Sequence, residues 1–120
     1  MPFYMFTASY TLDSLKAMVD NPQDREAAAR TLIEGIGGKL HGFFFTFGQS
    51  DVVAIIEMKD DIAMAAAALA VGASGTAAHG ATTKLLTAAE AMTAMAGAKK
   101  GRSKYKGPSA RRSPAARKRR

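Results

Sequence analysis

The chain has 120 residues, of which 48% are hydrophobic, and carries a formal net charge of +7. This length supports one domain with a modest core, and the absence of cysteine excludes disulfides, thiolate metal sites and cysteine nucleophiles. No apolar run reaches the ~18 residues of a membrane-spanning helix. The first ten residues lack the basic start and long apolar core of a secretory signal, so we expect a cytoplasmic protein without a membrane span.

The charge is divided unevenly along the chain. Residues 1–98 contain six basic and ten acidic side chains, a net charge of −4, whereas residues 99–120 contain eleven basic side chains and no acidic one. Glycine, proline and serine interrupt the basic segment, which cannot bury apolar area. The sequence therefore predicts a folded domain over residues 1–98 and a disordered, Lys/Arg-rich tail over residues 99–120.

The domain is expected to begin with a strand over residues 3–10, because aromatic and small residues occupy both of its alternating sets. Helical spacing predicts a helix over residues 12–19. A second helix is expected from Asn21 as N-cap and Pro22 as first helical residue, ending near the glycines at 35–38.

Two further strands, residues 39–47 and 50–58, are expected to form a hairpin around Gly48-Gln49. Strict alternation in the first of them places two sets of side chains on opposite faces: His41, Phe43, Phe45 and Phe47 on one, and Leu40, Phe44 and Thr46 on the other. The second strand is apolar on both faces, which is typical of a central strand.

Acidic residues at Asp60-Asp61 predict the start of an alanine-rich helix that continues to Val71. A strand over residues 78–86 follows, and Thr87 with Glu90 matches the capping box of a short last helix that ends near Gly97. The order β-α-β-β-α-β-α predicts an α+β fold, a ferredoxin-like βαββαβ sandwich with a four-stranded antiparallel sheet and a short C-terminal helix.

In this fold the helices cover one face of the sheet. The first and third strands are nevertheless apolar on both sides, so the other face also needs a cover. Two sheets packed face to face in a homodimer are the simplest solution, and a tetramer or higher oligomer is an alternative.

Several segments of the chain resemble the GYD-domain family of small bacterial and archaeal proteins. The resemblance covers roughly residues 1–96 and is carried by Tyr10-Thr11, Ala27-Ala28-Ala29-Arg30, Gly37-Gly38-Lys39-Leu40, Gly42-Phe43-Phe44-Phe45-Thr46-Phe47-Gly48, Asp51-Val52-Val53, Asp60-Asp61, Gly75, Thr82-Thr83 and Glu90. It implies a ferredoxin-like, dimeric α/β-barrel fold with no agreed activity.

The family is named for a Gly-x-Tyr-Asp turn, whereas this chain has Gly48-Gln49-Ser50-Asp51. Serine stands in place of the tyrosine, so no role of a motif tyrosine transfers to this chain.

Asp51 allows two interpretations. It can accept hydrogen bonds from N–H groups of the turn, or it can be a carboxylate at the mouth of an apolar pocket with a raised pKa. The structural role is favoured, because turn aspartates are common and no partner base is visible. Under the second interpretation the candidate ligand-binding residues are Asp51, Ser50, Phe45, Phe47 and His41. No catalytic residue can be identified.

His41 and His79 are the only histidines, and no ligand spacing typical of a metal site surrounds them. We therefore expect neither a metal nor another cofactor.

The basic segment is expected to bind nucleic acid or another polyanion weakly, without sequence preference and with strong salt dependence. The residues expected to do so are Lys99, Lys100, Arg102, Lys104, Lys106, Arg111, Arg112, Arg117, Lys118, Arg119 and Arg120.

Three hypotheses about function follow. The domain is a small-ligand-binding or regulatory module, or a cofactor-free monooxygenase or isomerase of the dimeric α/β-barrel type, the latter by analogy of fold alone. The third hypothesis is a nucleic-acid-associated protein that acts through its tail.

Overall fold

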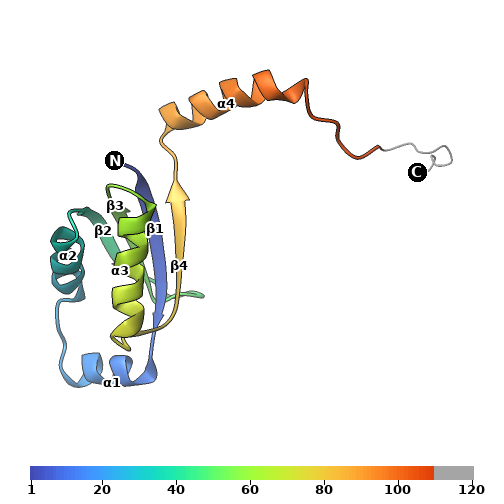
Figure 1. The fold of residues 1–120 in the computed structure, drawn as a ribbon. Coiled ribbons are helices and arrows are strands. Elements are labelled where there is room, and N and C mark those ends of the chain that lie inside the picture. The colour runs from blue at the N-terminus through green and yellow to red at the C-terminus, as the bar shows by residue number, and fades with distance from the viewer. Residues whose placement is uncertain (110–120) are drawn as a thin grey trace. The chain divides into compact units, whose positions relative to one another are not determined.

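The computed structural model describes residues 1–109 and contains a four-stranded antiparallel sheet (Figure 1). The elements in chain order are β1 (Phe3–Tyr10), α1 (Leu12–Asp20), α2 (Arg25–Gly35), β2 (Lys39–Phe45), β3 (Val52–Glu57), α3 (Asp61–Ala73), β4 (Ala77–Leu85) and α4 (Ala88–Arg102). The strand order β2-β3-β1-β4, with every neighbouring pair antiparallel, confirms the predicted ferredoxin-like α+β fold. Residues 1–86 form one compact unit, and α4 belongs to a second unit that begins at Thr87.

Short polar side chains fix the starts of the helices. Thr11 accepts a hydrogen bond from the Ser14 N–H, and Asp60 accepts one from the Ala63 N–H at 2.8 Å. The N-cap of α2 is Asp24, whose carboxylate accepts from the Ala27 N–H at 3.1 Å, so the predicted start at Asn21 and Pro22 is wrong. Asn21 instead ends α1, because its backbone N–H donates to the Ala17 carbonyl at 2.9 Å.

The β2–β3 connection is longer than the predicted two-residue turn. It spans residues 46–51, and the Thr46 N–H donates to the Asp51 carbonyl at 2.8 Å. The Asp51 N–H donates to the Ala8 carbonyl at 2.9 Å. These two bonds tie the end of the connection to the neighbouring strands.

A β-bulge in β2 changes the predicted alternation of side chains. Leu40 pairs with Ile56, but Gly42 rather than His41 pairs with Ile55. The extra residue moves His41 to the opposite face from Phe43, so the prediction that the two share a face is wrong.

The core lies between one face of the sheet and helices α2 and α3. Alternate residues of the two central strands point into it, as the burial of Tyr4 and Ala8 in β1 and of Ala54 and Ile56 in β3 shows. Ile33 of α2 and three residues of α3, Ala63, Met64 and Ala67, pack against them. We call this the covered face.

The other residues of the same strands form the second face of the sheet, which we call the open face. Met5 pairs with Ile55 and Thr7 with Val53, and all four side chains are half-buried. Phe44, on the edge strand β2, is 62% exposed. The central strands are thus apolar on both faces, as predicted.

Helix α4 begins with the predicted capping box, in which the Thr87 N–H donates to Glu90 Oε1 at 2.8 Å and the Glu90 N–H donates to Thr87 Oγ1 at 3.1 Å. It does not end near Gly97 but runs on to Arg102, so the expected boundary at residue 98 falls inside the helix. Lys99, Lys100 and Arg102 occupy its last turn, where positive charge interacts favourably with the helix dipole.

Candidate functional site

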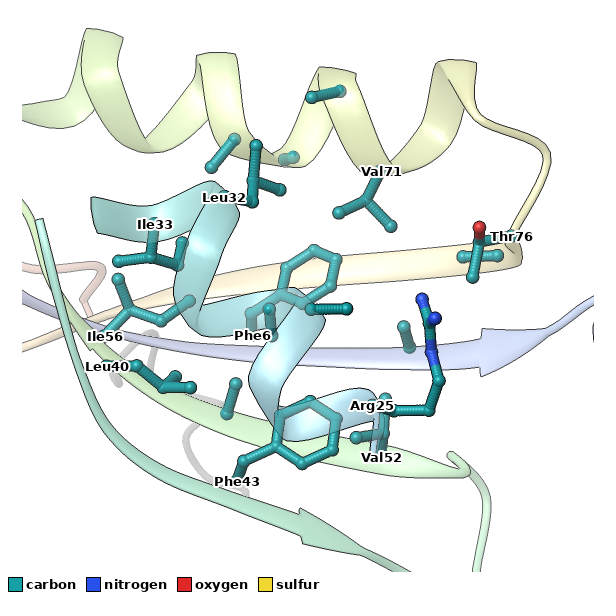
Figure 2. Close-up of a pocket in the computed structure, with 18 of the residues that line it drawn as sticks. Phe6, Arg25, Leu32, Ile33, Leu40, Phe43, Val52, Ile56, Val71 and Thr76 are labelled. Atoms are coloured by element: carbon teal, nitrogen blue, oxygen red, sulfur yellow. The ribbon is translucent and has the colours of Figure 1, made fainter. Parts of the chain in front are cut away.

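A cavity of about 270 Å³ lies on the covered face, between the sheet and helices α2 and α3 (Figure 2). Its volume is close to the lower end of the roughly 300–1,000 Å³ that is typical of ligand pockets. The residues that line it come from β1, β2 and β3 below and from both helices above, and the start of β4 closes one end.

Alanine accounts for the empty space. The helix residues that face the cavity include Ala28 and Ala29 of α2 and Ala67, Ala68 and Ala70 of α3. Alanine favours the helix but projects a single methyl group, so it leaves the room that a leucine or methionine would fill. Alanine does allow close packing at Ala63, which is buried and is not part of the cavity wall, but along the cavity it leaves a gap.

Most of the other residues in the wall are apolar. Phe6 and Phe43 contribute aromatic rings, and aliphatic side chains surround them, among them Leu32, Val52 and Val71 (Figure 2). Such a wall suits the hydrocarbon part of a small molecule, because burying apolar surface is the main source of affinity in such pockets.

Polar groups gather at one end of the cavity. Arg25, the first residue of α2, and Thr76, just before β4, lie at this end in Figure 2. Tyr10 and Ser74 also line the cavity, and the Ser74 hydroxyl donates to Thr76 Oγ1 at 2.8 Å. Among residues 1–109, Arg25 is the only charged residue in the lining.

Carboxylates near Arg25 in the sequence have other partners. Asp24 caps α2, and Glu26 forms an ion pair with Arg30 at 3.1 Å. Within the described part of the chain Arg25 forms no ion pair, and its Nη1 donates to the neutral side chain of Gln23 at 3.0 Å.

Tyr10 joins this polar end to strand β2 through its ring and to the β2–β3 connection through its backbone. Burial raises the pKa of its hydroxyl, and the neighbouring Arg25 guanidinium opposes part of that rise. Its backbone N–H donates to Asp51 Oδ2 at 2.9 Å, and its ring stacks on Phe45 with the centroids 5.9 Å apart. The Tyr10 hydroxyl is therefore protonated at neutral pH and can donate a hydrogen bond.

None of the five candidate ligand-binding residues lines the cavity, although Asp51 and Phe45 contact Tyr10, which does. The Asp51 carboxylate accepts a hydrogen bond from the N–H of Tyr10 in β1, whereas the favoured interpretation placed the donor in the turn itself. The Ser50 carbonyl accepts from the Thr46 hydroxyl, and the Phe47 side chain is fully exposed. A role for these residues in ligand binding stays a prediction.

His41, the fifth candidate, lies on the open face. Its Nε2 is 2.9 Å from Glu57 Oε1, and its ring meets Phe3 edge-on with the centroids 5.2 Å apart. The contact with His41 holds the pKa of Glu57 below its usual value. His79 is on β4, at the opposite edge of the sheet, so the two histidines do not form one site within the chain.

A second polar cluster lies where α3 begins. The buried Tyr4 hydroxyl donates to Asp61 Oδ1 at 2.6 Å, and Lys84 Nζ lies 3.1 Å from the same oxygen. Burial first, and then the bond to Asp61, raise the pKa of Tyr4 to about 12. The bonds from Tyr4 and Lys84 lower the pKa of Asp61. This cluster fastens α3 to β1 and β4.

The predicted polyanion-binding residues are only partly described. Lys99, Lys100 and Arg102 are on α4, and Lys104 and Lys106 follow it and are exposed. The remaining six, from Arg111 to Arg120, lie outside the described residues. Their binding of nucleic acid stays a prediction.

Two negative findings apply to residues 1–109. No cluster of three or more His, Asp or Glu side chains there could hold a metal ion. No helix in the same range is both long and apolar enough to cross a membrane.

Sequence reasoning missed the cavity and its polar end. Its signal in the sequence is Arg25, a cation in the first turn of a helix, where the dipole disfavours positive charge. The sequence analysis placed the first helical residue of α2 at Pro22, so it did not identify Arg25 as the first residue of the helix.

Comparisons with known proteins found two similar solved structures and one matching family. The crystal structure of MtbAldR (Rv2779c) is similar over 72% of this chain and 52% of its own, with 14% identity and a TM-score of 0.49, so this chain spans about half the length of that protein. An uncharacterized NIPSNAP domain protein from Burkholderia xenovorans is similar over 74% of this chain and 96% of its own, with 19% identity and a TM-score of 0.43. No curated protein sequence matches. The GYD domain model matches residues 4–95, and the chain therefore belongs to the GYD domain family.

Proposed function

We propose that residues 1–86 form a binding module for a small, mainly apolar molecule, which occupies the cavity on the covered face. The observation that carries the proposal is the cavity itself, about 270 Å³ of space that alanines of α2 and α3 leave open in an otherwise apolar wall. An apolar cavity with a few polar groups at one end is the usual form of a small-molecule site.

The lining favours binding over catalysis. The two titratable residues that line the cavity in the described chain are Arg25 and Tyr10. Arginine stays protonated, and the raised pKa of Tyr10 keeps its hydroxyl neutral near pH 7, so neither can act as a general base there. The enzymatic alternative therefore needs a base that this wall does not supply.

The experiment that tests the proposal fills the cavity. Ala29 lines it, whereas Ala27 on the same helix is exposed and does not, so Ala29→Leu and Ala27→Leu form a matched pair. We expect 1-octanol to bind the wild type and Ala27→Leu with the same affinity in calorimetry, and Ala29→Leu to bind it at least about tenfold more weakly. Equal binding to all three proteins would contradict the proposal, and so would the absence of binding to the wild type.

We propose further that the module is a homodimer in which two open faces pack together. Met5, Val53 and Ile55 give the centre of this face an apolar surface, and the exposed ring of Phe44 extends it towards the β2 edge. A second copy of the same face would bury these side chains, as a twofold interface does.

A weak affinity of the basic segment for nucleic acid is a separate proposal. The described part of that segment supports it with five cations, although the three in the last turn of α4 also have a structural reason to be there. Salt-sensitive binding that is lost when residues 103–120 are deleted would support it. Binding that survives the deletion would place the contact on the folded part instead.

A further inference from the structure

We propose that the ligand of the cavity is a small organic monocarboxylate, held with its apolar body among the alanine and phenylalanine side chains and with its carboxylate against Arg25. This inference rests on the proposed function and adds the chemical class of the ligand.

The first step is the position of the charge. Arg25 is the only cation that lines the cavity within residues 1–109, and it lies at the same end as Thr76 (Figure 2). All other lining residues there are neutral. One positive charge at the end of an apolar pocket matches a molecule with one negative charge at the end of an apolar body.

The second step is the lack of a carboxylate partner. Asp24 and Glu26 flank Arg25 in the sequence, but the first caps α2 and the second pairs with Arg30. The guanidinium donates to the neutral Gln23 Oε1 at 3.0 Å and also forms a hydrogen bond with the neutral Tyr10 hydroxyl. A guanidinium has five N–H donors in a planar fork that fits a carboxylate with two parallel bonds, so Arg25 keeps donors for a ligand.

The third step is the unfavourable electrostatic interaction between Arg25 and the dipole of its own helix. Arg25 is the first residue of α2, where the positive end of the helix dipole opposes a cation. A bound anion at this end would be attracted by both the guanidinium and the helix. Tyr10 and Thr76, whose hydroxyl groups can act as donors, also line the cavity.

One nearby charge acts in the opposite direction. The Asp51 carboxylate lies close enough to raise the pKa of Tyr10, and it would repel a bound anion. Its Oδ2 already accepts from the Tyr10 N–H at 2.9 Å, and Asp51 itself is not part of the cavity wall.

The test compares octanoate with 1-octanol, two probes of the same chain length that differ in charge. The proteins are the full chain, Arg25→Gln and the matched control Arg30→Gln, which removes the same charge from the same helix but from a residue outside the cavity. We expect the wild type to bind octanoate about tenfold more tightly than 1-octanol, since a hydrogen bond to a charged group contributes on that order.

Arg25→Gln should lose this preference and keep its affinity for 1-octanol, whereas Arg30→Gln should retain both affinities. In the wild type, higher ionic strength should weaken the binding of octanoate but not that of 1-octanol, a result that needs no variant. A preference that persists in Arg25→Gln, or one that salt does not change, would overturn the inference.

Two controls separate the possible failures. Equal affinity of the wild type for both probes would overturn the carboxylate and leave the apolar cavity site intact, whereas no binding of either probe would overturn the proposed function as well. The basic segment from Lys99 onward could also attract octanoate, so Ala29→Leu is included. If that variant still binds octanoate with the affinity of the wild type, the anion is bound outside the cavity and the inference is wrong.

Discussion

The two faces of the sheet use the same strands in different ways. On the covered face, Ala54 and Ile56 are buried beneath α2 and α3, yet the helices leave a cavity above part of the sheet. On the open face, Val53 and Ile55 come from the same strand and are only half-buried. The covered face thus has helices but is incompletely filled, and the open face is apolar and is not covered by any helix of residues 1–86.

The two faces therefore lack different contacts: the covered face lacks atoms inside a cavity, and the open face lacks a second surface packed against it. A cavity of limited volume between rigid elements accepts a small molecule, whereas a broad and shallow apolar face accepts another protein surface. The same alternation of residues along β1 and β3 therefore supplies both the proposed ligand site and the proposed dimer interface with apolar side chains. Changes on one face should affect one of these properties and leave the other intact.

The largest effect is expected on the open face. Ile55→Lys would place an ammonium group at the centre of the proposed interface in both copies, which should weaken the dimer at least about 100-fold because a buried unpaired charge costs several kcal/mol. Sedimentation velocity of the full chain measures this. Ala66→Lys, on an exposed position of α3, is the control and should leave the dimer unchanged. A wild type that sediments as a monomer at micromolar concentration would rule out the interface.

On the covered face, Tyr4→Phe removes the bond that fastens Asp61 and the start of α3. We expect the free energy of unfolding to fall by about 1.5–3 kcal/mol, as for a hydrogen bond to a charged group, with the oligomeric state retained. Urea titration at neutral pH checks the value. A loss of dimerisation in this variant would show that the two faces are not independent.

The same tyrosine predicts the behaviour at high pH. Its pKa is raised to about 12 in the folded chain, so the unfolded chain, with an ordinary pKa near 10, loses this proton first. The stabilisation is complete below pH 10 and is lost as the pH rises towards 12. Urea titrations over this range should show a steeper loss of stability in the wild type than in Tyr4→Phe, and identical slopes would contradict the assignment.

Filling the cavity should have a smaller effect on stability. Ala29→Leu places extra apolar surface in existing space and should raise the free energy of unfolding by about 1 kcal/mol, as other cavity-filling changes do. Ala27→Leu, at an exposed position, should change it by less than about 0.5 kcal/mol. Thermal and urea unfolding measure both. Marked destabilisation by Ala29→Leu would mean that the cavity cannot accommodate a leucine side chain.

The smallest effect is expected for Asp51→Asn. The amide oxygen of asparagine can still accept from the Tyr10 N–H, so the loss should be about 1 kcal/mol or less. A gain in stability would instead indicate that the native carboxylate is held under strain for a function, and would contradict the structural role of this residue.

Local signals in the sequence predicted much of the fold. Thr87 and Glu90 form the capping box that their spacing indicates. Strands β1 and β3 have apolar side chains on both faces, and this pattern correctly predicts that both lie in the middle of the sheet. These features depend on residues close together in the chain, or on a simple alternation, so tertiary packing does not need to be known.

Other features depend on contacts that the sequence does not reveal. Asn21-Pro22 and Asp24-Arg25 are both acceptable helix starts, and the choice of Asp24 follows from its bond to the Ala27 N–H. The bulge at His41 follows from the register of β2 on β3, which reverses the face of that side chain.

The candidate site was the least predictable part. The carboxylate of Asp51 drew attention to the β2–β3 connection because it is conspicuous in an apolar segment. The cavity is instead lined by alanines, and a run of alanine in a helix looks the same whether the helix packs closely or stands away from the sheet. Only the distance between α3 and the strands distinguishes the two, and that distance is set by larger side chains such as Met64 and Ile33.

The alanine wall has a consequence for how members of such a family can diverge. Leucine and methionine follow alanine closely in helix propensity, so an exchange at Ala28, Ala68 or Ala70 would reshape the cavity with little effect on the helices themselves. Each of these positions can change the length or width of the molecule that fits, while Arg25 stays in place at the end. Under the proposed function, selectivity for different ligands can therefore evolve by single exchanges on a constant scaffold.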